Sequence, residues 1–179
     1  MTAMHNETIG TVMITQEEIN AKAAEIGARI TEDYKGKSIV LVGILRGAVM
    51  WMADIMRNTR LDMCIDFMAC SSYGAATKSS GIVKINKDLD TDIEGKDVII
   101  VEDIVDSGVT LNYLMGYFES RGAASVKICA LLDKPTGRRV DINVDYVGFT
   151  VDDRFIVGYG LDYDQKYRNL PYITWLESN

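Results

Sequence analysis

The chain has 179 residues, a formal net charge of −7 and a hydrophobic fraction of 47%. This length fits one domain with a sizeable core, and the negative charge argues against non-specific nucleic-acid binding, which needs a basic surface. No apolar run is long enough to cross a membrane, and the first residues lack the apolar core of a signal peptide. We therefore expect a cytoplasmic protein.

The only histidine in the sequence is His5. A single histidine excludes Ser-His-Asp triads, Cys-His pairs and zinc sites built on histidine. The three cysteines, Cys64, Cys70 and Cys129, form no CxxC pair and have apolar neighbours, so we expect buried thiols without disulfides. Any catalysis must use carboxylates, lysine, arginine, tyrosine, hydroxyl groups or backbone amides.

The first half of the chain alternates between helical and strand patterns. A capping box, Thr15-Gln-Glu-Glu18, predicts the start of an amphipathic helix that ends near Tyr34. The apolar run at 38–44 does not alternate, which predicts a central strand covered on both faces. A helix at 46–57 and a strand at 62–70 follow.

Residues 71–95 are rich in Ser, Gly, Lys and Asp and show little periodicity. They predict a long loop, and a loop of this length in a compact domain is usually functional or disordered.

The second half continues the alternation. A strand is predicted at 97–102, and a helix at 108–121 that stops at Gly122. A strand at 125–133 follows, and shorter strands are predicted near 144–149 and 155–157. This order predicts an α/β fold with a central, mainly parallel, twisted sheet flanked by helices, in one domain spanning 1–179. Ligands of such sheets bind beyond the carboxyl ends of the strands.

Residues 98–111 read VIIVEDIVDSGVTL, a buried strand that runs into acids, hydroxyls and a glycine. Buried unpaired charges cost several kcal/mol, so Glu102, Asp103 and Asp106 either lie in water or hold something positive or hydroxylated. Residues 106–110 lead into a helix N-terminus, whose amides and dipole bind phosphate. No GxxxxGK[ST] or GxGxxG motif occurs. The ordinary alternative is that Asp106 is a helix N-cap preceded by two solvated acids.

The segment VIIVEDIVDSGVTL resembles the phosphoribosyl-pyrophosphate (PRPP) motif of the type I phosphoribosyltransferases. VGILRGAVMWMADIMR resembles the pyrophosphate loop and helix of the hypoxanthine-guanine branch, and SSYGAATKSSG resembles its mobile catalytic lid. LLDKP and DRFIVGYGLDYDQKYRNLPYI resemble its purine-binding strand and C-terminal hood. The matches run in family order from about residue 10 to the end. They imply the type I fold with a lid at about 71–95 and a small hood from about 1–15 and 150–179.

The resemblance implies a purine-salvage enzyme that transfers the phosphoribosyl group from PRPP to hypoxanthine or guanine. The products would be IMP or GMP and pyrophosphate, and the cofactor Mg²⁺. The resemblance also implies a homodimer or homotetramer that acts on small molecules, with no nucleic acid and no membrane. Asp106 is expected to be the general base and acid near purine N7, and Ser72 and Tyr73 are expected to close over the reacting centre.

The other implied contacts fall into three groups. Leu45-Arg46-Gly47 matches the pyrophosphate loop, whose first peptide is cis in the family, which commonly has Lys in place of Arg46. The PRPP group comprises Arg46, Gly47, Glu102, Asp103, Asp106, Ser107, Gly108, Val109, Thr110 and Arg168. The purine group comprises Lys134, Phe155, Ile156 and Asp162, and the Mg²⁺ group comprises Glu102, Asp103 and Asp162.

Alternatives to this function remain open. One is a transferase that prefers xanthine. Another is a non-catalytic regulator that keeps the PRPP fold and binds RNA, which the net charge disfavours. A plain α/β nucleotide-binding module would explain the phosphate loop but neither the lid nor the hood. Taken singly, Lys134 and Arg168 could be surface charges and Phe155 a core residue.

Overall fold

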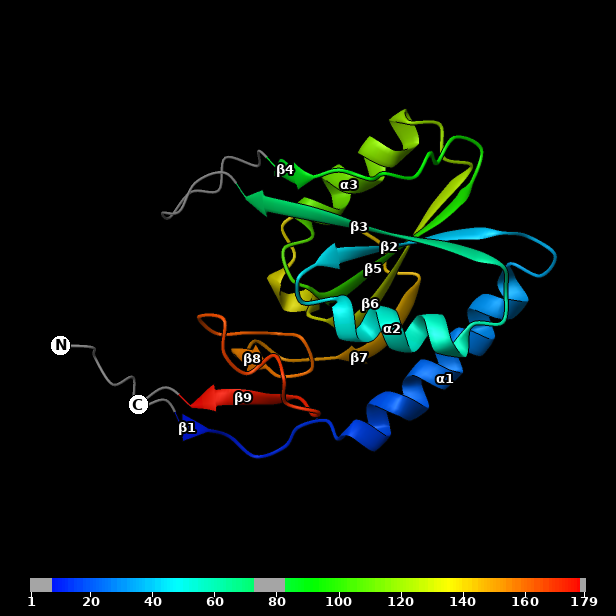
Figure 1. Ribbon diagram of the computed structural model, residues 1–179. Helices are drawn as coiled ribbons and strands as arrows, with labels where there is room; N and C mark the ends of the chain where they lie inside the picture. Colours follow the sequence, from blue (N-terminus) through cyan, green and yellow to red (C-terminus); the bar gives the residue numbers. More distant parts are fainter. Residues whose placement is uncertain (1–7, 73–82, 178–179) are drawn as a thin grey trace.

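The computed structural model describes residues 8–72 and 83–177. Its centre is a six-stranded sheet in the order β4-β3-β2-β5-β6-β7 (Figure 1). Neighbouring strands are parallel except β4, which runs antiparallel to β3. The predicted α/β fold with a mainly parallel sheet is therefore confirmed. The strands are β2 (Ile39–Leu45), β3 (Met63–Ser72), β4 (Val83–Lys87), β5 (Asp97–Val105), β6 (Ser125–Asp133) and β7 (Tyr146–Thr150).

Helices cover both faces of this sheet, with α1 (Gln16–Asp33) and α2 (Val49–Asn58) on one face and α3 (Val109–Ser120) on the other (Figure 1). The predicted capping box starts α1: the amide of Glu18 donates to Oγ1 of Thr15, and the amide of Thr15 donates to Oε2 of Glu18. A short 3₁₀ turn, η1 (Pro135–Gly137), follows β6.

The side chains of the central strands alternate between two apolar clusters. On the α1 and α2 face, Leu41 and Ile99 pack with Ile26 and Trp51. On the α3 face, Val42 and Ile100 pack with Phe118. Because both faces are covered, successive residues of β2 and β5 are all apolar, which is why these strands show no alternation in sequence.

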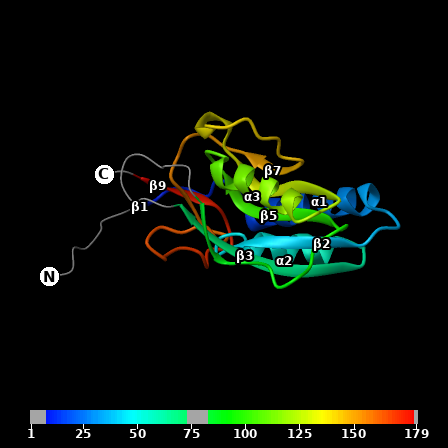
Figure 2. The same cartoon turned by 90° about the horizontal axis from the view of Figure 1, so that it is seen from above.

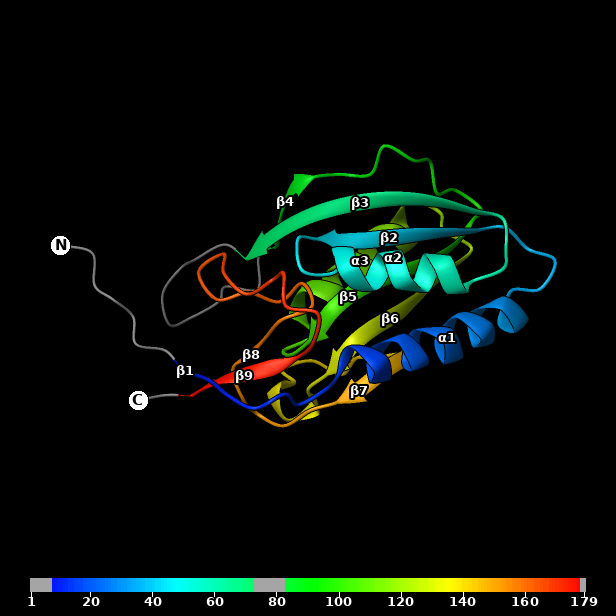
Figure 3. The ribbon, with the colours of Figure 1, turned by 60° about the horizontal axis from the view of Figure 1, so that its bottom comes forward.

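A second, three-stranded antiparallel sheet has the order β1-β9-β8 and joins segments from both ends of the chain. Its strands are β1 (Thr8–Ile9), β8 (Ile156–Val157) and β9 (Thr174–Glu177). Figures 1 and 3 show it beyond the carboxyl ends of the parallel strands, and Figure 2 shows β1 and β9 together at that end of the molecule.

Strand order reverses at β2, which pairs with β3 on one side and β5 on the other. The loops that follow β2 and β5 therefore run to opposite faces and leave a crevice, the usual ligand position in such sheets.

Several predicted boundaries were wrong. Strand β5 continues past its predicted end at Glu102 to Val105, because Ile104 and Val105 stay paired with β6. Residues 71–72 and 83–87 belong to β3 and β4 rather than to a loop. Helix α2 begins at Val49, since residues 46–48 form a turn.

The cysteines are free, as expected, but the expectation that all three are buried was wrong: Cys64 is exposed, Cys70 is half-buried and Cys129 is buried. Among the helices of the described residues, none has the length and apolarity that a membrane span requires.

Candidate active site

The crevice between β2 and β5 is lined on the β2 side by residues 45–47. The peptide bond between Leu45 and Arg46 is cis, as the resemblance implies. Gly47 lies against other backbone and side-chain atoms: a Cβ there would be 1.5 Å from Oδ2 of Asp103. A Cβ on Gly160 would in turn be 2.0 Å from the carbonyl oxygen of Gly47. Because neither glycine has a side chain, the segments that contain Gly47, Asp103 and Gly160 can approach one another closely.

On the β5 side, two adjacent carboxylates are partly buried at the end of the strand. Burial, with the negative charge of Asp103 beside it, raises the pKa of Glu102 well above its ordinary value of 4.5. Burial also raises the pKa of Asp103, although hydrogen bonds and the charge of Arg168 oppose this rise. Burial is the main cause of both shifts, because it disfavours the charged form of a carboxyl group.

This donor set fits Mg²⁺. Two neighbouring carboxylates supply the hard oxygen ligands that the ion prefers, and Mg²⁺ commonly takes its remaining ligands from water and from substrate phosphates. Within residues 8–72 and 83–177, no group of three or more acidic, histidine or cysteine side chains is arranged to hold a metal ion. Glu102 and Asp103 would therefore hold the ion together with substrate oxygens.

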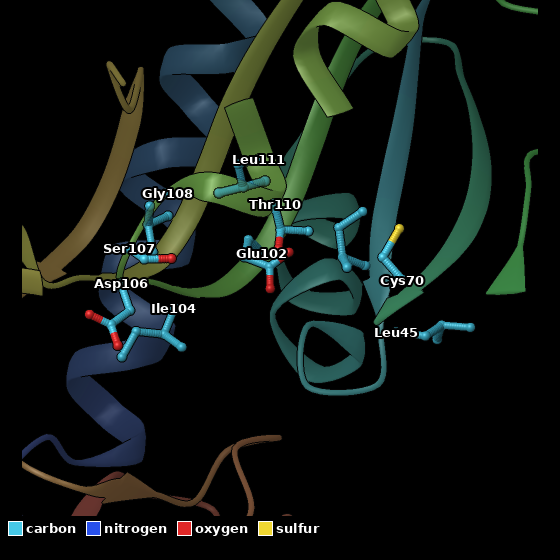
Figure 4. Close-up of a pocket in the computed structure, with 11 residues that line it drawn as sticks. Leu45, Cys70, Glu102, Ile104, Asp106, Ser107, Gly108, Thr110 and Leu111 are labelled. Atoms are coloured by element: carbon cyan, nitrogen blue, oxygen red, sulfur yellow. The ribbon is translucent and has the colours of Figure 1, made fainter. Parts of the chain in front are cut away.

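A cavity of about 280 Å³ opens at the end of β5 and the start of α3. Figure 4 shows the residues that line it, with Glu102 beside Thr110 and with Ser107 and Gly108 in the turn before α3. Gly108 has a φ of +76°, a conformation that favours glycine. The first amides of α3 have no partner within the helix, so this turn can cradle a phosphate group. The lining residues are Ile44, Leu45, Cys70, Glu102, Ile104, Val105, Asp106, Ser107, Gly108, Thr110 and Leu111.

The side chain of Asp106 does not cap α3. The N-cap residue is Gly108, with no side-chain hydrogen bond, so the alternative of Asp106 as N-cap was wrong. Its carboxylate instead lies against Gly137, where a Cβ would be 1.7 Å from Oδ1. Asp106 is exposed, with Nζ of Lys134 3.8 Å from Oδ2. This position leaves the carboxylate accessible to a substrate.

Lys134 follows β6, and its amide donates to the carbonyl of Val105 at 2.9 Å. Its ammonium forms an ion pair with Asp153 at 2.5 Å. The hydrogen bond with Asp153 is the main cause that raises the pKa of Lys134, and the charge of Asp106 adds to it. Lys134 is therefore a charged donor held between two carboxylates.

An aromatic surface lies in the same region. Phe155 is 54% exposed, so it is not a core residue. Tyr163 meets its ring edge-on, with centroids 5.3 Å apart. Ile156, the next residue, is buried in β8 opposite Trp175 of β9. An exposed aromatic face held by a strand offers a stacking platform for a planar base.

Two arginines, Arg46 from the loop after β2 and Arg168, bind residues 160–165. The guanidinium of Arg168 pairs with Asp162 at 2.7 Å and donates to the carbonyl of Gly160 at 2.7 Å. Arg46 is exposed and donates to Oε1 of Gln165 at 2.9 Å. Asp162 also accepts from the amide of Gln165. Within the described residues Asp162 is in an ion pair and does not join Glu102 and Asp103 in a metal group.

The predicted lid contacts cannot be placed. Tyr73 and the side chain of Ser72 lie outside the described residues. Sequence reasoning missed three residues that touch the site: Gly137, Arg138 and Asp153. The only signal was the glycine in KPTGRR, since a glycine in a polar turn can mark a close approach.

Comparisons with known proteins agree with this geometry. Residues 13–164 match the phosphoribosyl transferase domain family. The chain is 52% identical over 174 residues to the hypoxanthine-guanine phosphoribosyltransferase of Bacillus subtilis (strain 168), covering 97% of each chain. A corresponding enzyme of Streptococcus thermophilus is 53% identical over 174 residues, again with 97% of each chain covered.

Solved structures give the same result. The structure of a hypoxanthine phosphoribosyltransferase from Staphylococcus aureus superposes with a TM-score of 0.93 at 47% identity, covering 99% of this chain and 98% of the other. A hypoxanthine-guanine phosphoribosyltransferase from Bacillus anthracis, with HEPES in its active site, gives 0.91 at 42% identity, covering 97% and 100%. The chain therefore belongs to the hypoxanthine-guanine phosphoribosyltransferase family, within the phosphoribosyl transferase domain family.

Proposed function

We propose that this protein is a purine-salvage enzyme that transfers the phosphoribosyl group of PRPP to hypoxanthine or guanine, releasing pyrophosphate. The observation that carries the proposal is the cluster around the end of β5. The turn at 106–110, the acidic pair of Glu102 and Asp103, and the ion pair of Asp106 with Lys134 lie together there. The chain is also 52% identical to an enzyme named hypoxanthine-guanine phosphoribosyltransferase. Xanthine-preferring and RNA-binding alternatives lack a comparable supporting observation.

The proposed binding of PRPP follows the geometry. The amides and hydroxyls of residues 106–110 hold the 5′-phosphate at the start of α3, where the helix dipole favours an anion. Glu102 and Asp103 accept hydrogen bonds from the ribose hydroxyls and hold Mg²⁺. When bound there, the ion would supply positive charge for the pyrophosphate. Arg46, Arg168 and the backbone of Gly47 contact the pyrophosphate directly.

The proposed recognition of the purine uses three groups. Phe155 stacks on the ring, and the backbone of Ile156 binds the base edge. The ammonium of Lys134 donates to the six-position oxygen. A six-amino group presents a donor instead of an acceptor there, which would leave two donors opposed and one of them unsatisfied. This arrangement favours hypoxanthine and guanine over adenine.

The proposed chemical step moves one proton. As pyrophosphate leaves, the ribose carbon develops positive charge and is attacked by a purine nitrogen, and the base gives up a proton from N7. Asp106 accepts that proton and returns it in the reverse direction. Ser72, Tyr73 and the lid would exclude water from the reacting centre.

A spectrophotometric assay tests the proposal, with PRPP and Mg²⁺ present and with hypoxanthine, guanine, xanthine and adenine offered separately. We expect nucleoside monophosphate from hypoxanthine or guanine and loss of turnover when Mg²⁺ is chelated. Faster turnover of xanthine would establish the xanthine alternative. PRPP binding without turnover of any base would favour the regulator. We further propose a homodimer or homotetramer, which sedimentation velocity tests.

A further inference from the structure

Residues 134–139, which follow β6, form a continuous support under the phosphate turn. The amide of Lys134 donates to the carbonyl of Val105, and the amide of Arg139 donates to the carbonyl of Ser107 at 3.0 Å. These two bonds flank the point at which β5 ends. Between these two bonds lies Arg138, whose side chain joins the end of β5 to the end of β6.

Arg138 holds three acceptors with one guanidinium. Its Nη1 donates to the carbonyls of Val105 at 2.7 Å and Asp106 at 2.6 Å, and its Nη2 pairs with the carboxylate of Asp133. Both partners of the ion pair are largely buried, at 18% and 15% exposure. Partial burial reduces the solvent screening that makes surface pairs weak. The planar fork of arginine presents its donors in a fixed geometry, whereas a lysine ammonium is a compact charge on a flexible stem.

Residues between 138 and 142 pack against Gly108, the glycine of the phosphate turn. A Cβ on Gly108 would lie 2.8 Å from Ile142, 3.2 Å from Val140 and 3.6 Å from Cδ of Arg138. The stem of Arg138 thus packs behind the turn while its guanidinium holds the backbone that enters it. The proposed 5′-phosphate site is therefore supported by a residue that does not line the cavity.

Gly137 completes this support because it lies against the carboxylate of Asp106. A methyl group at this position would displace Oδ1, from which an ideal Cβ is only 1.7 Å away. Gly137 is not among the glycines with positive φ, so alanine would fit the backbone there. The glycine is therefore needed for space beside Asp106 and not for its conformation.

We propose that Arg138 and Gly137 are positioning residues of the phosphoribosyl transfer: Arg138 aligns the phosphate turn and Gly137 leaves room for the carboxylate of Asp106. Neither contacts substrate in this assignment. The inference rests on the proposed function, because it names the residues that align the same site. It also links purine recognition to PRPP binding, since Lys134 belongs to the supporting segment.

The test compares Arg138→Met, Arg138→Lys and the control Arg60→Met, which changes an exposed side chain at the amino end of β3. Steady-state kcat and KM for PRPP are measured well below each variant's Tm. A displacement of about 1 Å can reduce a rate about 100-fold, so we expect a loss of that order in kcat/KM for PRPP in Arg138→Met. Arg138→Lys should restore only part of it, and Arg60→Met should match the unchanged enzyme.

A second comparison sets Gly137→Ala against Gly116→Ala, where a Cβ on α3 meets nothing within 4 Å. Gly137→Ala should reduce kcat with little change in the KM for PRPP, and Gly116→Ala should leave both unchanged. A lower Tm in Arg138→Met and Gly137→Ala with unchanged kcat and KM would overturn the inference and leave the proposed function standing. No turnover by the unchanged enzyme with any purine would overturn both.

Discussion

Lys134 and Asp106 face one another across the end of β5, with Nζ of the lysine 3.8 Å from Oδ2 of the aspartate. A six-oxo purine presents O6 and N7 along one edge. One bound base can therefore meet the charged donor and the carboxylate at the same time. This pairing links the choice of base to the proton transfer.

Replacing Asp106 by Asn keeps the size of the side chain but removes its basicity. General acid–base groups contribute about 10²–10⁴-fold to rates, so we expect kcat to fall by that order. Binding of ribose 5-phosphate, measured by calorimetry, should change little. Asp141→Asn, an exposed acid outside the site, is the control. Loss of ribose 5-phosphate binding in a folded Asp106→Asn variant would contradict the assignment.

Replacing Lys134 by Met removes the donor to the six-position oxygen. Hydrogen bonds to charged groups contribute about 1.5–3 kcal/mol, which corresponds to about 10- to 100-fold in kcat/KM for hypoxanthine. The activity ratio of hypoxanthine to adenine should fall in parallel. A preserved ratio would show that another group reads this position.

The charge of Lys134 also predicts a pH dependence. Its pKa is raised above 10.5, chiefly by the hydrogen bond with Asp153, so the side chain loses its charge only as the pH rises through the higher folded value. The KM for hypoxanthine should therefore show no ionisation of this lysine between pH 6 and 9, measured by initial rates. In Asp153→Asn the alkaline rise in KM should begin at a lower pH.

Glu102→Gln should stabilise the free protein at neutral pH. Because the folded pKa of Glu102 lies above 4.5, the folded state holds a proton that the unfolded state releases, and stability falls as the pH rises above 4.5 toward the folded pKa. Glutamine carries no proton that titrates, so Glu102→Gln does not lose stability in this way as the pH rises. We expect its Tm to exceed that of the unchanged protein at pH 7, with the difference shrinking below pH 4.5.

Glu119→Gln, which changes an exposed acid on α3, is the control variant. The same Glu102→Gln variant should bind PRPP and Mg²⁺ more weakly in calorimetry. A lower Tm at pH 7, or unchanged affinity for both, would argue against the acidic pair as the ion-binding site.

The cysteines should differ in their reaction with iodoacetamide, since the thiolate is the reactive form. Burial raises the pKa of Cys70 to about 11 and that of Cys129 to about 12. Cys64 is exposed, so peptide mass spectrometry should find it labelled first. Equal labelling of Cys129 in the folded protein would contradict its burial.

The crossing of α1 and α2 predicts a stability effect. A Cβ on Gly27 would lie 2.6 Å from the backbone of Asn58, so Gly27→Ala should cost about 1–3 kcal/mol in unfolding free energy through overpacking. Gly116→Ala faces open space within a helix and should instead stabilise by about 1 kcal/mol. Urea denaturation measures both, and a stabilising Gly27→Ala would contradict the close crossing.

Strands β2 and β5 were predictable because their central residues are buried on both faces and read as apolar runs. Strand β4 was missed because it is an edge strand with polar residues, and only pairing with β3 defines it. Strands β1, β8 and β9 have two to four residues, and β1 and β9 pair from opposite ends of the chain. No local pattern could show these pairings.

In the candidate site, the phosphate turn was predictable because its residues are contiguous. The capping assignment for Asp106 failed because Gly108 is the N-cap and the carboxylate of Asp106 instead pairs with Lys134, which follows a different strand. Likewise, the low strand propensity of acidic residues suggested that β5 ends at Glu102, whereas pairing with β6 extends it to Val105. Long-range contacts decided each of these cases.

The antiparallel pairing of Thr8 with Glu177 brings the two ends of the described chain to one edge of the small sheet. A short linker could therefore join them, with new ends opened between Arg60 and Leu61 at the amino end of β3. Circular permutants tolerate such exposed positions. A permuted enzyme would carry fusion partners on the side of the sheet away from its substrates, which suits this fold to immobilisation without blocking entry to the crevice.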